Sequence, residues 1–115
     1  MSAGKESLLK FNMHPIPTKL RNEMSDDLFY KKCCRQDENC DGRITWEHAL
    51  MYAGRQIQKK WAIIPLCVYH HLGPGLNKHL NQYIALERAT AADLAEYPKK
   101  DWGAEKRSLK FVLKV

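Results

Sequence analysis

The sequence has no long hydrophobic run, because no uninterrupted apolar stretch approaches the roughly 20 residues that span a bilayer. The first 17 residues also lack the apolar stretch that forms the centre of a secretory signal. We therefore expect a protein that stays in the cytoplasm where it is made. The sequence contains no internal repeat and no low-complexity segment, which argues against a repeat array.

Cysteine is scarce, and the Cys-X-X-Cys motif of thiol redox proteins does not occur. The cysteines are Cys33, Cys34, Cys40 and Cys67. Disulfides rarely persist in a reducing compartment, so clustered cysteines there favour a metal site. A redox centre at Cys33 and Cys34 is disfavoured, because vicinal cysteines form strained bridges.

Negative charge is in deficit. The chain has 19 Lys and Arg residues against 13 Asp and Glu residues, a formal net charge of +6. A basic excess of this size on a small surface attracts the phosphate backbone of nucleic acids, whatever their base sequence. With 115 residues the chain is long enough for one domain and too short for two. Nucleic acid is therefore the leading candidate partner.

Local patterns predict an α+β fold with short elements. Ile44 and Trp46 alternate with polar residues, as in a half-buried strand, and 61–65 reads as a second strand that Pro65 stops. Ser25 and Thr90 are candidate helix caps. The expected elements are an arm without a helix at 1–24, helices at 25–32, 67–72, 76–89 and 91–97, a loop at 48–60 and a terminal strand at 108–115. We expect the arm to precede a core at 25–90, which a helix and a strand at 91–115 extend.

Two short-range pairs of soft ligands predict a structural zinc site. Cys34 and Cys40 are separated by five residues, and Cys67 and His70 by two. Three thiolates and one imidazole complete the tetrahedral shell that structural zinc prefers. Cys33 can replace Cys34 as the ligand, which lengthens the spacing to Cys40 by one residue. Buried free cysteines are the alternative, but the loop between the first pair is too polar for a core role.

Glu47 and His48 follow the first ligand pair closely, and His71 follows the second pair without a gap. One zinc ion that joins both pairs would bring these distant residues together. A carboxylate and an imidazole suit a divalent cation on a phosphate, and a neutral histidine can take a proton from water. We expect Glu47 and His71 to hold the cation and His48 to activate the water.

The segments CRQDENC, GRITWEHA and IIPLCVYHH together resemble an HNH endonuclease of the zinc-knuckle type, also called a His-Me finger or ββα-metal nuclease. The resemblance spans residues 33–72. It implies a zinc-stapled ββα-metal core with a short hairpin and flanking helices, with Glu47 as first metal ligand, His48 as general base and His71 as closing ligand. The family's Asn, nine residues before the closing His, falls at Ala62 in this chain.

The resemblance implies hydrolysis of DNA phosphodiesters assisted by Mg²⁺ or a similar cation. Small free-standing members of the family commonly belong to phages, which would place the protein in the host cytoplasm. The alternative is a noncatalytic zinc-knuckle module that binds nucleic acid, and Ala62 is its main support. Basic residues that flank the site in sequence and are candidates for phosphate contacts are Arg43, Arg55, Lys59, Lys60 and Lys78.

Overall fold

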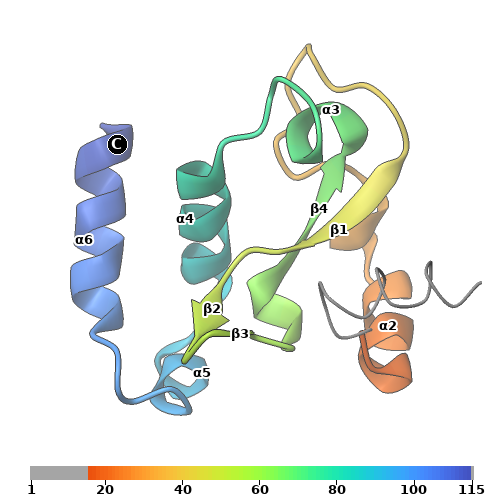
Figure 1. Cartoon of the computed structure of the whole chain (residues 1–115). Coiled ribbons are helices and arrows are strands. Elements are labelled where there is room, and N and C mark those ends of the chain that lie inside the picture. Colours follow the sequence, from red (N-terminus) through yellow and green to blue (C-terminus); the bar gives the residue numbers. More distant parts are fainter. Residues whose placement is uncertain (1–15, 115) are drawn as a thin grey trace, which may run out of the picture.

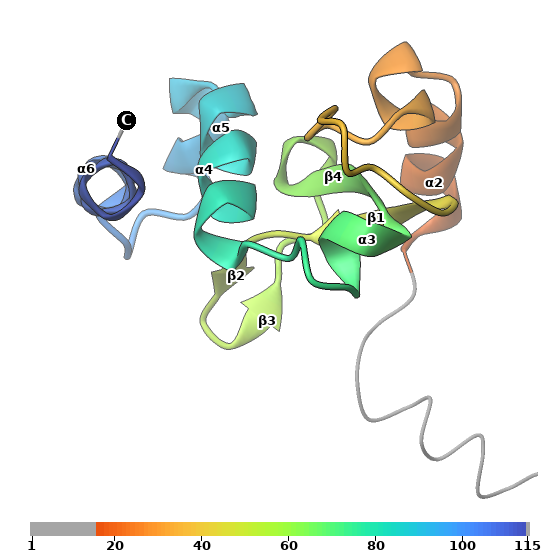
Figure 2. The ribbon, with the colours of Figure 1, turned by 90° about the horizontal axis from the view of Figure 1, so that it is seen from above.

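The computed structural model describes residues 16–114 and has an α+β fold, as the sequence predicts. A pair of antiparallel strands, β1 (Ile44–His48) and β4 (Ile63–Cys67), lies between α2 (Thr18–Ser25) at one end of the molecule and α6 (Trp102–Leu113) at the other (Figures 1 and 2). None of the helices in this part of the chain combines the length and apolar character needed to cross a membrane.

The β1–β4 pair is the centre of the fold. Its register places Glu47 opposite Ile64 and Ile44 opposite Cys67, and every residue of β4 is buried. Pro65 lies inside β4 and does not stop the strand as the sequence suggested. Within residues 16–114, β4 pairs with β1 alone, so the Pro65 nitrogen, which carries no hydrogen, can face the outer edge of β4. The Pro65 carbonyl accepts from the Cys34 N–H on that edge.

The segment after β1 is not the irregular loop that we expected. It forms a second antiparallel pair, β2 (Met51–Tyr52) with β3 (Arg55–Gln56). The two turn residues, Ala53 and Gly54, both have positive φ values, 53° and 80°. Two-residue turns of this kind match the twist of a tight hairpin. Gly54 is therefore one of the residues that permit the hairpin.

The N-terminal part of the described chain is helical, which corrects the expectation of an arm without a helix. α2 spans Thr18–Ser25, and residues 1–15 of the expected arm lie outside the described residues. The helix predicted at 25–32 is only a 3-10 helix at Leu28–Lys31, and its cap is Asp27 instead of Ser25. Met24 and Tyr30 from this region pack with Ile63 of β4 in a small buried cluster.

Three helices follow β4 at the predicted places: α3 (Val68–His71), α4 (Lys78–Arg88) and α5 (Ala91–Ala95). The Asn77 side chain caps α4 by accepting from the Leu80 N–H. Thr90 caps α5 in a reciprocal capping box with Asp93. The main core lies between α4 and β4, where Leu66 and Ala85 are fully buried.

The last element is a helix, α6 (Trp102–Leu113), and the predicted terminal strand is wrong. Asp101 caps this helix by accepting from the Ala104 N–H. Trp102 and Leu109, two turns apart, are buried, and the helix packs along α4. Phe111, which an alternating strand would bury beside Leu109, is 85% exposed.

Candidate metal centre and active site

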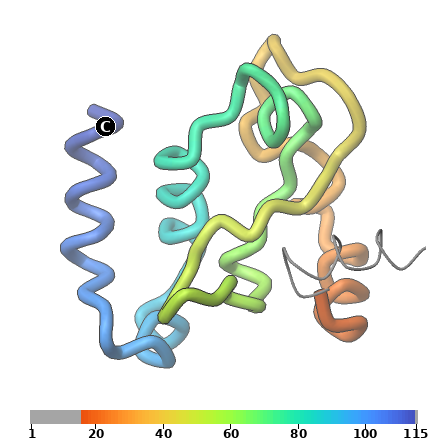
Figure 3. Tube along the Cα trace, in the orientation of Figure 1, coloured from red at the N-terminus to blue at the C-terminus, as the bar shows by residue number. Residues whose placement is uncertain are grey.

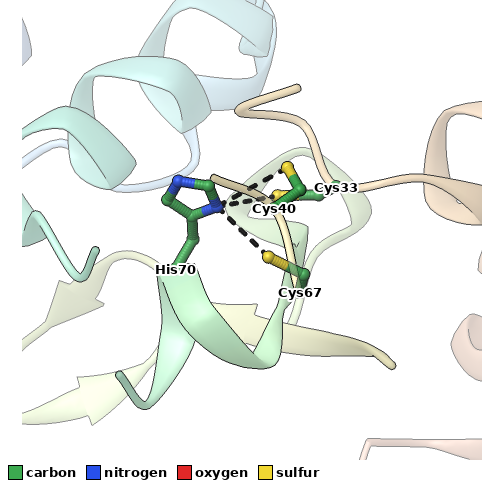
Figure 4. Close-up of side chains that lie close together, drawn as sticks. All are labelled: Cys33, Cys40, Cys67 and His70. Carbon is green, nitrogen blue, oxygen red and sulfur yellow. Dashed lines mark hydrogen bonds between the residues drawn. The ribbon is translucent and has the colours of Figure 1, made fainter. Parts of the chain in front are cut away.

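Four side chains meet in one cluster, Cys33, Cys40, Cys67 and His70 (Figure 4). Cys33 follows the first 3-10 helix, Cys40 comes from the polar loop before β1, Cys67 ends β4, and His70 lies on α3. In the trace, the loop that carries Cys40 passes over α3 (Figure 3), and the Tyr69 N–H donates to the Asp41 carbonyl. The cluster thus joins this loop to β4 and α3.

The geometry of the cluster fits a tetrahedral zinc ion. The His70 Nδ1 atom lies 3.6, 3.7 and 3.2 Å from the sulfur atoms of Cys33, Cys40 and Cys67. Zinc bonds of ordinary length at tetrahedral angles place a nitrogen and a sulfur about 3.5 Å apart. All four ligand atoms lie within 4.8 Å of one another. The cluster can therefore hold a metal ion such as zinc.

Cys33, and not Cys34, belongs to this cluster. The Cys34 backbone N–H donates to the Pro65 carbonyl, which fixes the chain so that the preceding residue supplies the ligand. The Cys34 side chain packs against the main core. Burial, helped by the neighbouring Cys33, raises the pKa of the Cys34 thiol to about 12. The zinc site that we predicted with Cys34 is therefore corrected to one with Cys33.

The residues around the cluster support two of its ligands. Asp37 Oδ2 lies 3.0 Å from His70 Nε2, so the carboxylate holds the ring with Nδ1 facing the sulfurs. The hydrogen bond from the Asn39 N–H makes the largest contribution to lowering the pKa of Asp37, and the hydrogen bond with His70 lowers this pKa further. Burial opposes ionisation of Cys67, but the Asp41 N–H and further hydrogen bonds lower its pKa to about 6. A thiol with a low pKa is readily available as the thiolate that zinc requires.

Gly42 allows the polar loop to approach α3 closely. Its φ is +89°, and an added Cβ would lie 2.8 Å from the Cβ of Val68. Neither the conformation nor the space suits another residue. The Val68 N–H donates to the Arg43 carbonyl directly beyond this contact, which leads the chain into β1. Gly42 thus sets the distance between the cluster and the start of β1.

Glu47 and His71, predicted to share a cation, face each other. Glu47 Oε1 lies 2.8 Å from His71 Nε2, and the two side chains are 17% and 20% exposed. Glu47 comes from β1, and His71 ends α3, next to the ligand His70. The expected juxtaposition across 24 residues of sequence is therefore present, with both groups open to solvent on one side.

Thr45 orients the His71 ring, and no sequence pattern indicated this role. Its hydroxyl lies 2.8 Å from the Leu66 carbonyl and 2.6 Å from His71 Nδ1. A carbonyl only accepts, so the hydroxyl proton goes to Leu66 and Nδ1–H donates to the hydroxyl. In a neutral His71 the lone pair of Nε2 then faces the Glu47 carboxylate. A cation or a proton between these two acceptors would make the arrangement favourable.

His48 does not join the Glu47–His71 pair. It follows Glu47 on β1, and successive side chains of a strand point to opposite faces. His48 Nε2 lies 2.9 Å from Gln58 Oε1, in the segment before the 3-10 helix Lys60–Ala62. The Ala49 N–H donates to the Ala62 carbonyl, so position 62 supports the end of β1 through its backbone. Gln58 is a second residue that no sequence pattern indicated.

The five basic residues proposed for phosphate contacts divide into two groups. Arg43, Arg55 and Lys78 are exposed. Lys59 and Lys60 make ion pairs with Glu96 and Asp27, at 3.1 and 2.8 Å. Of these, Arg43 stands two residues before Thr45 and four before Glu47, so continuation of the strand alternation places it on their face.

Comparison of the chain with protein-family models, with curated proteins and with solved structures finds no match. The sequence and the geometry of the two clusters, Cys33–Cys40–Cys67–His70 and Glu47–His71, are therefore the observations on which a function can be argued.

Proposed function

We propose that this protein is a metal-dependent endonuclease of the HNH type that hydrolyses DNA phosphodiester bonds. The observation that carries the proposal is the pairing of Glu47 Oε1 with His71 Nε2 at 2.8 Å. Glu47 lies on β1, the strand that pairs with β4, and His71 lies on α3 next to the cluster residue His70. Zinc in that cluster has a structural role, because four protein ligands fill its tetrahedral shell.

The Glu47–His71 pair suits a divalent cation such as Mg²⁺. Ligands at adjacent positions of an octahedral Mg²⁺ site, with bonds of about 2.1 Å, lie about 3.0 Å apart. The observed separation of 2.8 Å is close to this value. Mg²⁺ sites commonly use one or two protein ligands and keep water and substrate phosphate oxygens at the rest. The partial exposure of both side chains leaves room for these additional ligands.

His48 is the residue that we assign as general base; it directly follows the cation ligand Glu47 at the end of β1 and would act on a water on the opposite side of the phosphate from the cation. It takes a proton from water, the water oxygen forms a bond with phosphorus, and the bond from phosphorus to the leaving oxygen breaks. Solvent returns a proton to the leaving oxygen, so the products are a phosphate monoester and an alcohol. A divalent cation, when bound, neutralises phosphate charge and stabilises the leaving oxygen.

The charge of the protein supports a nucleic-acid substrate. The net charge is +6, and the exposed Arg43 directly precedes β1, the strand that carries Glu47. Arg55 and Lys78 are exposed on the β2–β3 hairpin and at the start of α4. We assign these three residues to contacts with the phosphate backbone and leave Lys59 and Lys60 as weaker candidates, because each makes an ion pair with an acidic neighbour.

The test is nicking of supercoiled plasmid by purified, zinc-loaded protein supplied with Mg²⁺ or Mn²⁺. We expect His48→Ala and Glu47→Gln each to reduce the nicking rate by about 100-fold or more, in line with the loss of a general base or a cation ligand. His79→Ala is the matched control, because His79 is an exposed histidine on α4. Equal nicking by wild type and by both site variants would refute the proposal.

A noncatalytic zinc module that binds nucleic acid is the second candidate. Ala62 favours it, because this position carries no side-chain amide to support the base. The hydrogen bond from the Ala49 N–H to the Ala62 carbonyl gives part of that support through the backbone and favours catalysis. Salt-dependent binding of DNA without cleavage under Mg²⁺, Mn²⁺, Ni²⁺ or Zn²⁺ would decide for the binding module.

A further inference from the structure

His48 and Gln58 form a contact between two segments that are fixed independently. His48 ends β1, where the next residue, Ala49, donates its N–H to the Ala62 carbonyl. Gln58 follows Ile57, which is 2% exposed and donates its N–H to the Leu50 carbonyl. Backbone hydrogen bonds and burial therefore hold both partners, and the separation of 2.9 Å between Nε2 and Oε1 follows from two anchored backbones.

The chemistry of the contact selects one form of the imidazole. The oxygen of a side-chain amide can only accept a hydrogen bond. Nε2 of His48 must therefore carry a proton and donate it to Gln58 Oε1. In the neutral ring the other nitrogen, Nδ1, is then the one with a lone pair. The contact with Gln58 thus determines which ring nitrogen carries the lone pair.

We propose that Gln58 is the positioning residue of the active site, which holds His48 as the Nε2–H tautomer and leaves Nδ1 to accept the proton from water. The catalytic part of this inference rests on the endonuclease function proposed above. Gln58 acts through His48 and touches no reacting atom, so its loss should lower kcat and leave KM for DNA unchanged.

The structural part can be tested without activity. Long-range ¹H–¹⁵N correlation spectra of the full zinc-loaded chain, recorded at a pH where the imidazole is neutral, distinguish a protonated Nε2 from a protonated Nδ1. We expect the Nε2–H pattern for His48 in the wild type. A protonated Nδ1 in the neutral ring would overturn the inference, whether or not the protein cleaves DNA.

Two substitutions at position 58 separate positioning from packing. Gln58→Leu keeps most of the side-chain volume and removes the acceptor, and Gln58→Glu retains an acceptor oxygen at the same place. We expect Gln58→Leu to weaken the preference for the Nε2–H tautomer and to reduce kcat by about 10–100-fold, a part of what general-base catalysis contributes. Gln58→Glu should keep the Nε2–H pattern and most of the rate.

The possible outcomes distinguish this inference from the proposed function. A pure Nε2–H pattern in wild type and a mixture of tautomers in Gln58→Leu, in a protein that cuts no DNA, would support the role of Gln58 and refute the nuclease. Cleavage by wild type with unchanged kcat and tautomer in Gln58→Leu would support the nuclease and overturn the role of Gln58. If Gln58→Leu does not fold, the wild-type spectrum and the Gln58→Glu variant still decide.

Discussion

The two vicinal cysteines allow a direct test of the metal centre, because the structure gives them opposite roles. Cys33 lies 3.6 Å from His70 Nδ1 within the cluster, whereas Cys34 packs against the core and has a thiol pKa raised by burial to about 12. We expect Cys33→Ala to weaken zinc binding severely and Cys34→Ala to leave it nearly unchanged. The two variants remove the same atom from adjacent positions, so each is the control for the other.

The magnitude follows from the number of ligands. Structural zinc sites bind with apparent free energies of about 10–16 kcal/mol at neutral pH. An equal share for each of the four ligands is about 2.5–4 kcal/mol, which corresponds to roughly a 10²- to 10³-fold loss of affinity. Because binding of zinc also stabilises the fold, the same free energy should appear as a lower thermal midpoint in Cys33→Ala.

The assay is zinc content of the purified protein by elemental analysis, followed by competition with a chelator of known affinity. Wild type and Cys34→Ala should retain about one zinc per chain, and Cys33→Ala should give up zinc at a chelator concentration roughly 10²-fold lower or more. Zinc loss in Cys34→Ala with retention in Cys33→Ala would refute the assignment. The absence of zinc from wild type, after refolding with the metal, would refute the whole centre.

Three further predictions concern the surroundings of the cluster and the core. Asp37→Asn should lower zinc affinity by about 10–100-fold in the same competition assay, because the carboxylate orients the imidazole ligand; an unchanged affinity would argue against that role. Gly42→Ala should destabilise the zinc-loaded protein by about 1–3 kcal/mol in urea unfolding. The effect should be larger than that of Gly54→Ala, because both glycines have positive φ but, of the two, only Gly42 has other atoms in the space of an added Cβ. Leu109→Ala should lower the free energy of unfolding by about 2–5 kcal/mol, as expected for a buried leucine. Phe111→Ala, at an exposed position, should change the free energy of unfolding by less than about 0.5 kcal/mol. Equal effects of the two substitutions would contradict the helical assignment of α6.

The elements that the sequence predicted well are those with a local cause. Ile44 and Trp46 alternate with polar residues and form β1, and Thr90 with Asp93 makes the cap of α5. These signals depend on neighbours within a few residues, so they can be recognised without the fold. The prediction of a terminal strand was wrong because the local pattern of this segment was ambiguous. Alternating Leu109 and Phe111 suggested a strand, while packing of Trp102 and Leu109 against α4 decided for a helix.

The metal centre also combines features that the sequence predicts with features that only the fold determines. The types and spacing of Cys40, Cys67 and His70 were sufficient to predict a tetrahedral site, because zinc selects thiolates and imidazoles. The choice between Cys33 and Cys34 depended on the backbone hydrogen bond from Cys34 to Pro65, two segments that are distant in sequence. A one-residue ambiguity of this kind can be resolved only when the direction of the chain at that point is known.

What the sequence determined by itself is the chemistry available: a basic chain, four soft ligands in two pairs, and Glu47, His48 and His71 placed beside them. Tertiary structure decided which of these groups meet. It brought Glu47 to His71 and turned His48 to Gln58. The physical reason is that residue type fixes what a side chain can bind or donate, whereas strand register and alternation fix the face on which it lies.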